Sequence, residues 1–123
     1  MRDQKGGIQM WIFEAQFKLK PDADVDEMLR LFKELAVPIY RKIPGCISAS
    51  ILKYTSDFNI PPEWDYAFVD VWESKEANEK AVKDGYIGLE SSSQLARTGF
   101  YEKLQAMAEK SSMAFAEQVA SSK

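Results

Sequence analysis

The sequence predicts an α+β fold in which a four-stranded antiparallel sheet carries helices on one face. Three patterns support this prediction. Residues 64–74, WDYAFVDVWES, combine the aromatic and β-branched side chains of a central strand with an immediate helix start. Residues 8–20 alternate between two faces as a strand does, and residues 25–43 repeat apolar side chains at helical spacing. With a second and a final strand, the order becomes β-α-β-β-α-β, which is the ferredoxin-like plan.

Length and composition fit one domain over residues 1–123, in which the polar residues 1–7 form a flexible arm that ends in Gly-Gly. A hydrophobic content of 46% is enough for a core, and the net charge of −3 gives no reason to favour nucleic acid or an anionic membrane as partner. No signal peptide is recognisable, and the apolar stretches are far shorter than the ~20 residues of a membrane span. We therefore expect a cytoplasmic protein.

The chain contains no histidine and a single cysteine, Cys46. The lack of histidine excludes His-ligated zinc or haem and any Ser-His or Cys-His nucleophile pair. The sequence also lacks a Gly-rich phosphate loop, a cysteine cluster and the carboxylate spacing of a metal site, so we expect neither a metal nor a cofactor. Cys46 is interpreted as an inert core thiol, with a reactive thiol as the alternative.

The first strand, residues 8–20, has two distinct faces. One face carries Trp11, Phe13, Ala15, Phe17 and Leu19, and the other carries Met10, Ile12, Glu14, Gln16 and Lys18. Asp24 or Asp26 can cap the following helix, which has a bend or break at Pro38 and ends at Pro44-Gly45.

The second strand, residues 46–54, places Cys46, Ser48, Ser50, Leu52 and Tyr54 on one face and Ile47, Ala49, Ile51 and Lys53 on the other. A loop with two prolines, residues 55–63, leads to the central strand. The central strand places Trp64, Tyr66, Phe68, Asp70 and Trp72 on one face and Ala67, Val69, Val71 and Glu73 on the other. Ser74 is the expected N-cap of a short helix over residues 75–83.

Residues 90–110 resume helical character, with an interruption at Thr98-Gly99. Residues 112–120, SMAFAEQVA, alternate as a fourth strand, although Ala, Glu and Gln also suit a helix.

Helices on one side leave the opposite sheet face uncovered in a monomer. That face would carry Met10, Ile12, Ile47, Ala49, Ile51, Ala67, Val69 and Val71. An apolar area of this size is unfavourable in water, so we expect a homodimer that packs sheet against sheet.

Two passages resemble a known family. FVDVWESKEANEKAV resembles the x-x-V-x-x-W-E-S-x-E-A signature of the antibiotic biosynthesis monooxygenase-like group of dimeric α/β barrel proteins, and PGCISASIL resembles the start of their second strand. The resemblance covers about residues 9–120 and implies a dimeric α/β barrel. The group includes cofactor-free quinone-forming monooxygenases, haem-degrading enzymes and members without an assigned activity, so fold alone does not decide the function.

The chain differs from the haem-degrading members of the family at residues that their activity requires. Haem-degrading relatives carry an Asn in the first strand, a Trp in the third and a His in the next helix. Trp72 matches the Trp, but the Asn position falls on Ala15 or Gln16 and the His position near Val82, so haem chemistry is not implied. Polyketide-oxidising relatives use Asn, Trp and Tyr to activate an electron-rich phenol. For that chemistry the chain offers Trp72, several tyrosines and the amide of Gln16.

Asp70 is the sharpest candidate for catalysis. Among aromatic neighbours its pKa would rise toward the range of a general base, and Trp72 and Gln16 are the other candidate catalytic residues. The alternative is a carboxylate that is satisfied by a neighbouring Tyr, Lys or Arg, or that lies where the strand reaches solvent. Four aromatic side chains are candidates to bind substrate between sheet and helices, with core packing as the alternative: Trp11, Phe13, Tyr54 and Tyr66.

Two functional hypotheses follow. In the first, the protein is a cofactor-independent monooxygenase, an oxidoreductase that acts on a hydrophobic aromatic or polyketide-like small molecule. In the second, it is a non-catalytic ligand-binding or stress-associated homodimer. A solvent-connected pocket of ~300 Å³ or more that includes Asp70 would favour the enzyme, and a packed interior would favour the second hypothesis.

Overall fold

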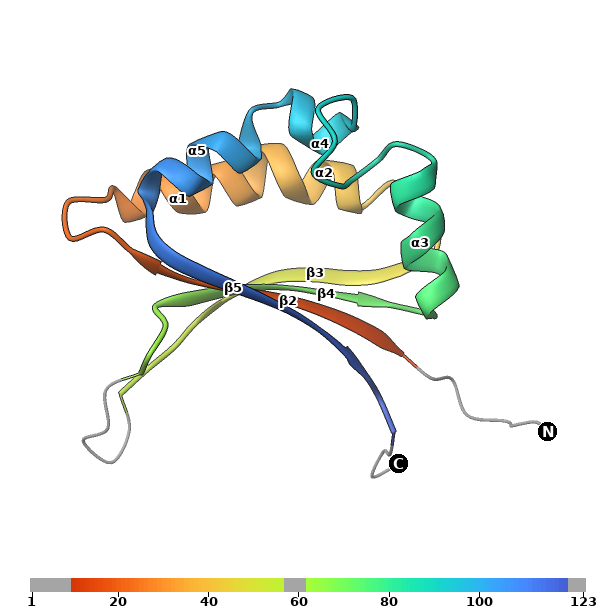
Figure 1. Cartoon of the computed structure of the whole chain (residues 1–123), viewed down its shortest axis with the longest axis horizontal. Helices are drawn as coiled ribbons and strands as arrows, with labels where there is room; N and C mark the ends of the chain where they lie inside the picture. Colours follow the sequence, from red (N-terminus) through yellow and green to blue (C-terminus); the bar gives the residue numbers. More distant parts are fainter. Residues whose placement is uncertain (1–9, 57–61, 120–123) are drawn as a thin grey trace.

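The computed structural model describes residues 10–56 and 62–119, which form four strands and six short helical segments (Figure 1). The strands are β2 (Trp11–Leu19), β3 (Cys46–Lys53), β4 (Tyr66–Trp72) and β5 (Ala108–Glu117). The helical segments are α1 (Val25–Leu31), the π-helical η1 (Phe32–Ala36), α2 (Val37–Tyr40), α3 (Lys75–Lys83), α4 (Gln94–Arg97) and α5 (Phe100–Met107). The expected flexible arm, residues 1–7, lies outside the described residues.

The four strands form one antiparallel sheet in the order β3-β4-β2-β5. This arrangement confirms the ferredoxin-like plan and the fourth strand, which begins at Ala108 directly after α5 rather than at Ser112. β4 is central. Its helix-facing side chains are buried, whereas Val69 and Val71 on its other face are half-buried, and β5 is an exposed edge strand.

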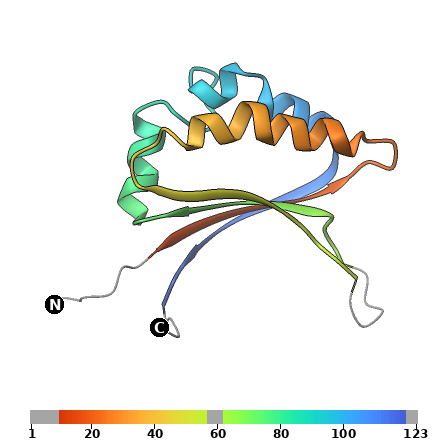
Figure 2. The same cartoon turned by 180° about the vertical axis from the view of Figure 1, so that it is seen from behind.

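All helices lie on one side of the sheet, and the strand ends curve away from them (Figures 1 and 2). The core fills the space between the two layers. At its centre the Phe32 ring lies 4.8 Å from the Phe68 ring and 5.0 Å from the Phe100 ring, measured between centroids. The stacked Phe17 ring continues this aromatic core toward the end of β2. Within the described residues, no helix is long and apolar enough to cross a membrane.

The first helical region is continuous from α1 through α2, with an irregular turn where a bend was expected. Pro38 has no backbone N–H to donate to the preceding turn, and its ring crowds the carbonyl four residues earlier. The five residues before α2 widen into a π-helical turn, in which the Val37 N–H bonds to the Phe32 carbonyl. The helix thereby accommodates Pro38 without breaking.

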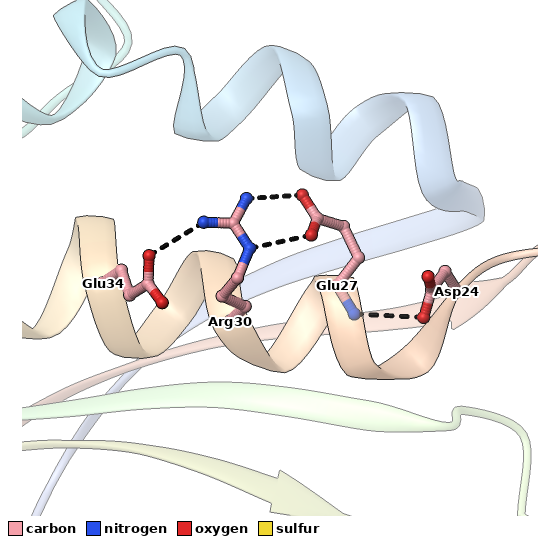
Figure 3. A network of polar contacts seen from close by, with 4 residues as sticks. All are labelled: Asp24, Glu27, Arg30 and Glu34. Carbon is pink, nitrogen blue, oxygen red and sulfur yellow. Dashed lines mark hydrogen bonds and ion pairs between the residues drawn. The ribbon is translucent and has the colours of Figure 1, made fainter.

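Side chains at the start of α1 explain why the helix begins there (Figure 3). The Asp24 carboxylate accepts a hydrogen bond from the Glu27 N–H at 3.1 Å, as expected for an N-cap. Arg30 donates to both Glu27 carboxylate oxygens and to Glu34, at 2.7 to 2.8 Å. Ion pairs that are this exposed to solvent contribute little to stability, so the buried face of the helix provides most of it.

α3 packs close to the turn that precedes β3, and the expected Ser74 cap holds its first turn by accepting from the Ala77 N–H. Gly45, at φ +86°, is the residue at the closest approach, because a Cβ there would lie 2.6 Å from the Ala77 Cβ. A glycine is therefore required for both the backbone conformation and the packing.

The faces predicted for β3 are wrong. Ala49 and Ile51 lie directly opposite Asp70 and Phe68 of β4 and pack on the core, instead of facing away from the helices. A register shift between Cys46 and Ser48 accounts for the difference, because one extra residue reverses the alternation that follows it.

The sheet face without helices, called the outer face below, is therefore less apolar than expected. Directly paired residues assign to it Ile12, Glu14, Gln16, Ser48, Ser50, Leu52, Ala67, Val69, Val71, Ser112, Ala114 and Ala116. In β4, Val69 and Val71 are half-buried, although no helix covers them.

Candidate functional site

Asp70 and Trp72 lie on the helix-facing side of β4, two residues apart and therefore on the same face. Both are fully buried, with Asp70 only 1% exposed. The Trp72 indole N–H donates to Oδ2 of Asp70, whereas Oδ1 has no hydrogen-bond partner among the described residues. A buried carboxylate oxygen without a partner is energetically costly, which marks this position as a candidate site.

Burial controls the electrostatics of Asp70. Desolvation raises the pKa of its carboxyl from 3.8 to about 7, and the hydrogen bond from Trp72 opposes this rise. The pKa of the Tyr40 hydroxyl is raised by its own burial and then by the charge of Asp70, and the same two causes raise the pKa of Cys46 to about 11. Asp70 is therefore the group of this cluster that can exchange a proton near neutral pH.

Aromatic rings surround the carboxylate. The Tyr40 ring lies 6.3 Å from the Trp72 ring and 5.2 Å from the Phe68 ring. The pKa of the Tyr101 hydroxyl is also raised, mainly by burial of the side chain and to a smaller extent by the charge of Asp70. These contacts exclude water from the carboxylate and explain its raised pKa.

Sequence analysis did not single out Tyr40 as part of this site. A signal was present, because Phe32, Ala36 and Tyr40 follow each other at intervals of four residues on the buried side of the helical region.

Two expected substrate-binding residues adjoin this pair. Trp11 lies directly opposite Trp72 across the β2–β4 ladder, and Phe13 lies directly opposite Asp70. Both are partly exposed. Tyr66, by contrast, lies at the other end of β4, where it is buried and stacks on Phe17 with centroids 6.0 Å apart.

Gln16 and Tyr54 lie on the outer face and not beside Asp70. The Gln16 amide donates to the Tyr54 hydroxyl at 2.8 Å, and this hydroxyl donates to Oε2 of Glu14 at 3.1 Å. The structure thus joins two predicted site residues to each other and separates them from Trp72.

A pocket of about 330 Å³ opens at the end of the sheet where β2 leaves for α1. Its lining includes Leu19, Lys20, Lys53, Asp65 and Tyr66. Asp65 is partly engaged there, because its Oδ2 accepts from the Leu19 N–H at 2.8 Å. A pocket of this size that included Asp70 was expected for an enzyme. Asp70 and Trp72 do not line this pocket.

Metal ligands do not gather anywhere in residues 10–56 and 62–119, where no group of three or more Cys, Asp or Glu side chains is placed to hold an ion. The Asp70 carboxyl can transfer a proton in an aromatic surrounding.

A family model and several solved structures match this chain and agree with the fold described above. The family model described as antibiotic biosynthesis monooxygenase matches residues 10–88. No match was found among curated protein sequences.

Several solved structures share the fold at low sequence identity. A variant of SnoaB, a cofactor-independent oxygenase from Streptomyces nogalater, aligns with a TM-score of 0.64 and 12% identity over 94% of this chain and 98% of that chain. A dimeric ferredoxin-like protein of unknown function from Bacteroides fragilis aligns with a TM-score of 0.54 and 17% identity, covering 89% and 96%. A dimeric ferredoxin-like protein from an uncultured marine organism aligns with a TM-score of 0.62 and 17% identity, covering 92% and 90%.

Proposed function

Because the chain belongs to the antibiotic biosynthesis monooxygenase family, we propose that it is a cofactor-independent monooxygenase that oxidises a hydrophobic aromatic or polyketide-like small molecule in the cytoplasm. The observation that carries the proposal is the Asp70 carboxyl, which is buried among aromatic rings and has a pKa of about 7, and whose Oδ1 has no partner within residues 10–56 and 62–119. The oxygenase from Streptomyces nogalater, which shares the fold, supports the reaction class.

In the proposed reaction Asp70 acts as general base. Its Oδ1 removes a proton from the phenol or from the activated ring carbon of the substrate, which leaves an electron-rich anion. The anion forms a C–O bond with dioxygen, and the resulting peroxide takes a proton back. Loss of water then converts the ring CH₂ into a carbonyl, so that one oxygen atom enters the product and the other leaves as water.

Trp72 is a positioning residue in this proposal. Its N–H holds Oδ2 of Asp70, so the free Oδ1 is the atom that meets the substrate. Aromatic side chains around the carboxylate supply an apolar surface for a planar ring. Gln16 has no part in the proposed step, because it lies on the outer face with Tyr54.

Turnover of an anthrone under oxygen tests the proposal, with formation of the anthraquinone followed by absorbance and dioxygen uptake by an electrode. Loss of the general base in Asp70→Asn is expected to lower kcat by about 10²–10⁴-fold. Trp72→Phe keeps the base without its hydrogen bond and is expected to lower kcat less. Asp84→Asn, at the exposed end of α3, is the matched control and should turn over like wild type.

Equal turnover in wild type, Asp70→Asn and Trp72→Phe would contradict both proposed roles. Thermal unfolding of each variant shows whether a loss of turnover reflects a loss of fold.

The proposed assembly is a homodimer through the outer face. Its apolar residues, among them Val69 and Val71, are uncovered by helices, and two structures of the same fold are described as dimeric. A second copy is the simplest closed solution for such a face.

A non-catalytic ligand-binding or stress-associated dimer is the second candidate function. Two observations favour it. The pocket of about 330 Å³ does not include Asp70, and Asp70 itself is almost completely buried. Under this alternative no anthrone is oxidised by the wild-type protein at any pH.

A further inference from the structure

We propose that three side chains at the open end of β2 and β5 form the surface on which a planar, hydroxylated aromatic substrate stacks. We call Trp11, Phe13 and Phe115 the aromatic patch. The class of substrate rests on the proposed function, whereas the location of the patch rests on its own geometry.

The patch is held in a fixed arrangement. The Trp11 and Phe115 rings stack with centroids 5.5 Å apart and planes at 24°, and the Phe13 ring lies 5.0 Å from the Phe115 ring. The Lys75 ammonium group lies 5.6 Å from the Trp11 centroid, which further restrains that ring. Phe115 is nevertheless 56% exposed, so a supported aromatic surface remains open to a ligand.

The patch is continuous with the candidate site. Phe115 lies directly opposite Phe13, and Phe13 lies directly opposite Asp70 on the other side of β2. Directly opposite side chains of an antiparallel pair have Cβ atoms about 4.5–5.5 Å apart. A single side chain, Phe13, therefore stands between the exposed ring of Phe115 and the buried carboxylate.

Two observations favour a small aromatic ligand over a protein partner. The first is the stacking geometry, in which Trp11 and Phe13 support the Phe115 ring. The second is Oδ1 of Asp70, which is buried in the adjoining position and receives no hydrogen bond from the part of the chain that the structure describes. A hydroxylated ring that stacks on the patch lies within one side chain, Phe13, of that buried acceptor oxygen, and a small ligand can supply a hydroxyl donor at that distance.

Binding of 1,8-dihydroxyanthraquinone tests the proposal without any turnover, because this probe has the planar hydroxylated ring system and is already oxidised at the central ring. Affinity is measured by calorimetry for wild type, Phe115→Ala, Phe115→Tyr and the control Leu89→Ala, which truncates another exposed apolar residue. We expect Phe115→Ala to weaken binding about 3- to 10-fold, as loss of one stacking partner predicts. Phe115→Tyr and Leu89→Ala should bind within about twofold of wild type.

Three results would overturn the proposal. The first is that the wild-type protein does not bind the probe. The second is that Phe115→Ala binds the probe as tightly as wild type. The third is that Phe115→Ala sediments differently from wild type, which would make the patch a contact between subunits.

These outcomes are distinct from failure of the proposed function. Probe binding that depends on Phe115 in a protein that oxidises no anthrone would refute the monooxygenase alone. Anthrone turnover with an unchanged KM in Phe115→Ala, together with unchanged probe binding, would refute the patch alone.

Discussion

The two faces of the sheet are built from the same strands but have different chemistry. On the helix-facing side, β4 presents Tyr66, Phe68, Asp70 and Trp72, and helices exclude water from all four. On the outer face the same strand presents Ala67, Val69 and Val71, with no helix over them. The Asp70 carboxylate on the helix-facing side is desolvated, whereas the Glu14 carboxylate on the outer face accepts a hydrogen bond from the Tyr54 hydroxyl.

The comparison shows that burial by the helices, rather than the strand sequence alone, gives Asp70 its raised pKa. The outer face instead combines small apolar side chains with a hydrogen-bonded polar network. Such a surface suits contact with a second copy, because the network is already satisfied when it is buried.

The largest expected effect comes from a charge placed on the outer face. Val71→Glu should give a monomer or an aggregate, since it would bury an unpaired carboxylate between two sheets at a cost of several kcal/mol. Val82→Glu, on the exposed side of α3, is the matched control and should leave the assembly unchanged. Sedimentation velocity of both variants measures the effect, and an undisturbed dimer for Val71→Glu would show that the outer face is not the interface.

A smaller effect is expected from neutralising Asp70 on the helix-facing side. Its pKa is raised on folding, so its contribution to stability is complete below about pH 4 and is lost as the pH rises toward 7. A rise from 3.8 to about 7 corresponds to about 4 kcal/mol. Asp70→Asn should therefore be more stable than wild type near pH 8, by up to about that amount.

Urea unfolding of the two proteins near pH 4.5 and pH 8 measures this difference. The two proteins should approach each other in stability at the lower pH. A stability difference that does not vary with pH would mean that the Asp70 pKa is not raised.

The smallest effect is expected from the polar network of the outer face. Tyr54→Phe removes the donor to Glu14 and the acceptor for Gln16, which should weaken the proposed dimer by about 1–3 kcal/mol because Glu14 is left unpaired. Tyr101→Phe removes an acceptor on the helix-facing side, where the Gly88 N–H bonds to the hydroxyl, and should leave the dimer unchanged. Dissociation constants from sedimentation equilibrium compare the two, and equal effects would place Tyr54 away from the interface.

The fold was largely predictable because its signals are local. Alternation along residues 64–74 correctly placed Asp70 and Trp72 on one face, and the Ser74 cap fixed the start of α3. The fourth strand was also predicted, although its composition would suit a helix, because Met113 and Phe115 alternate with small residues. The family match to residues 10–88 confirms the resemblance seen in the sequence.

The parts that failed depend on register or on distant contacts. The register shift after Cys46 leaves no trace in a run of small residues, so the faces of Ala49 and Ile51 were reversed. Phe115 meets Phe13 only through the pairing of β5 with β2, two strands that are distant in the sequence. Gln16 was placed on the correct face by alternation, and that placement already separated it from Asp70.

The Asp70 carboxyl allows the most direct test of the account. Its protonation can be followed by the carboxyl ¹³C resonance in protein labelled at aspartate, with Asp70→Asn used to assign the signal. Titration of this one resonance with a midpoint near pH 7 is the predicted result. A midpoint near 4, the ordinary value for an exposed aspartate, would contradict a desolvated base at the centre of the site.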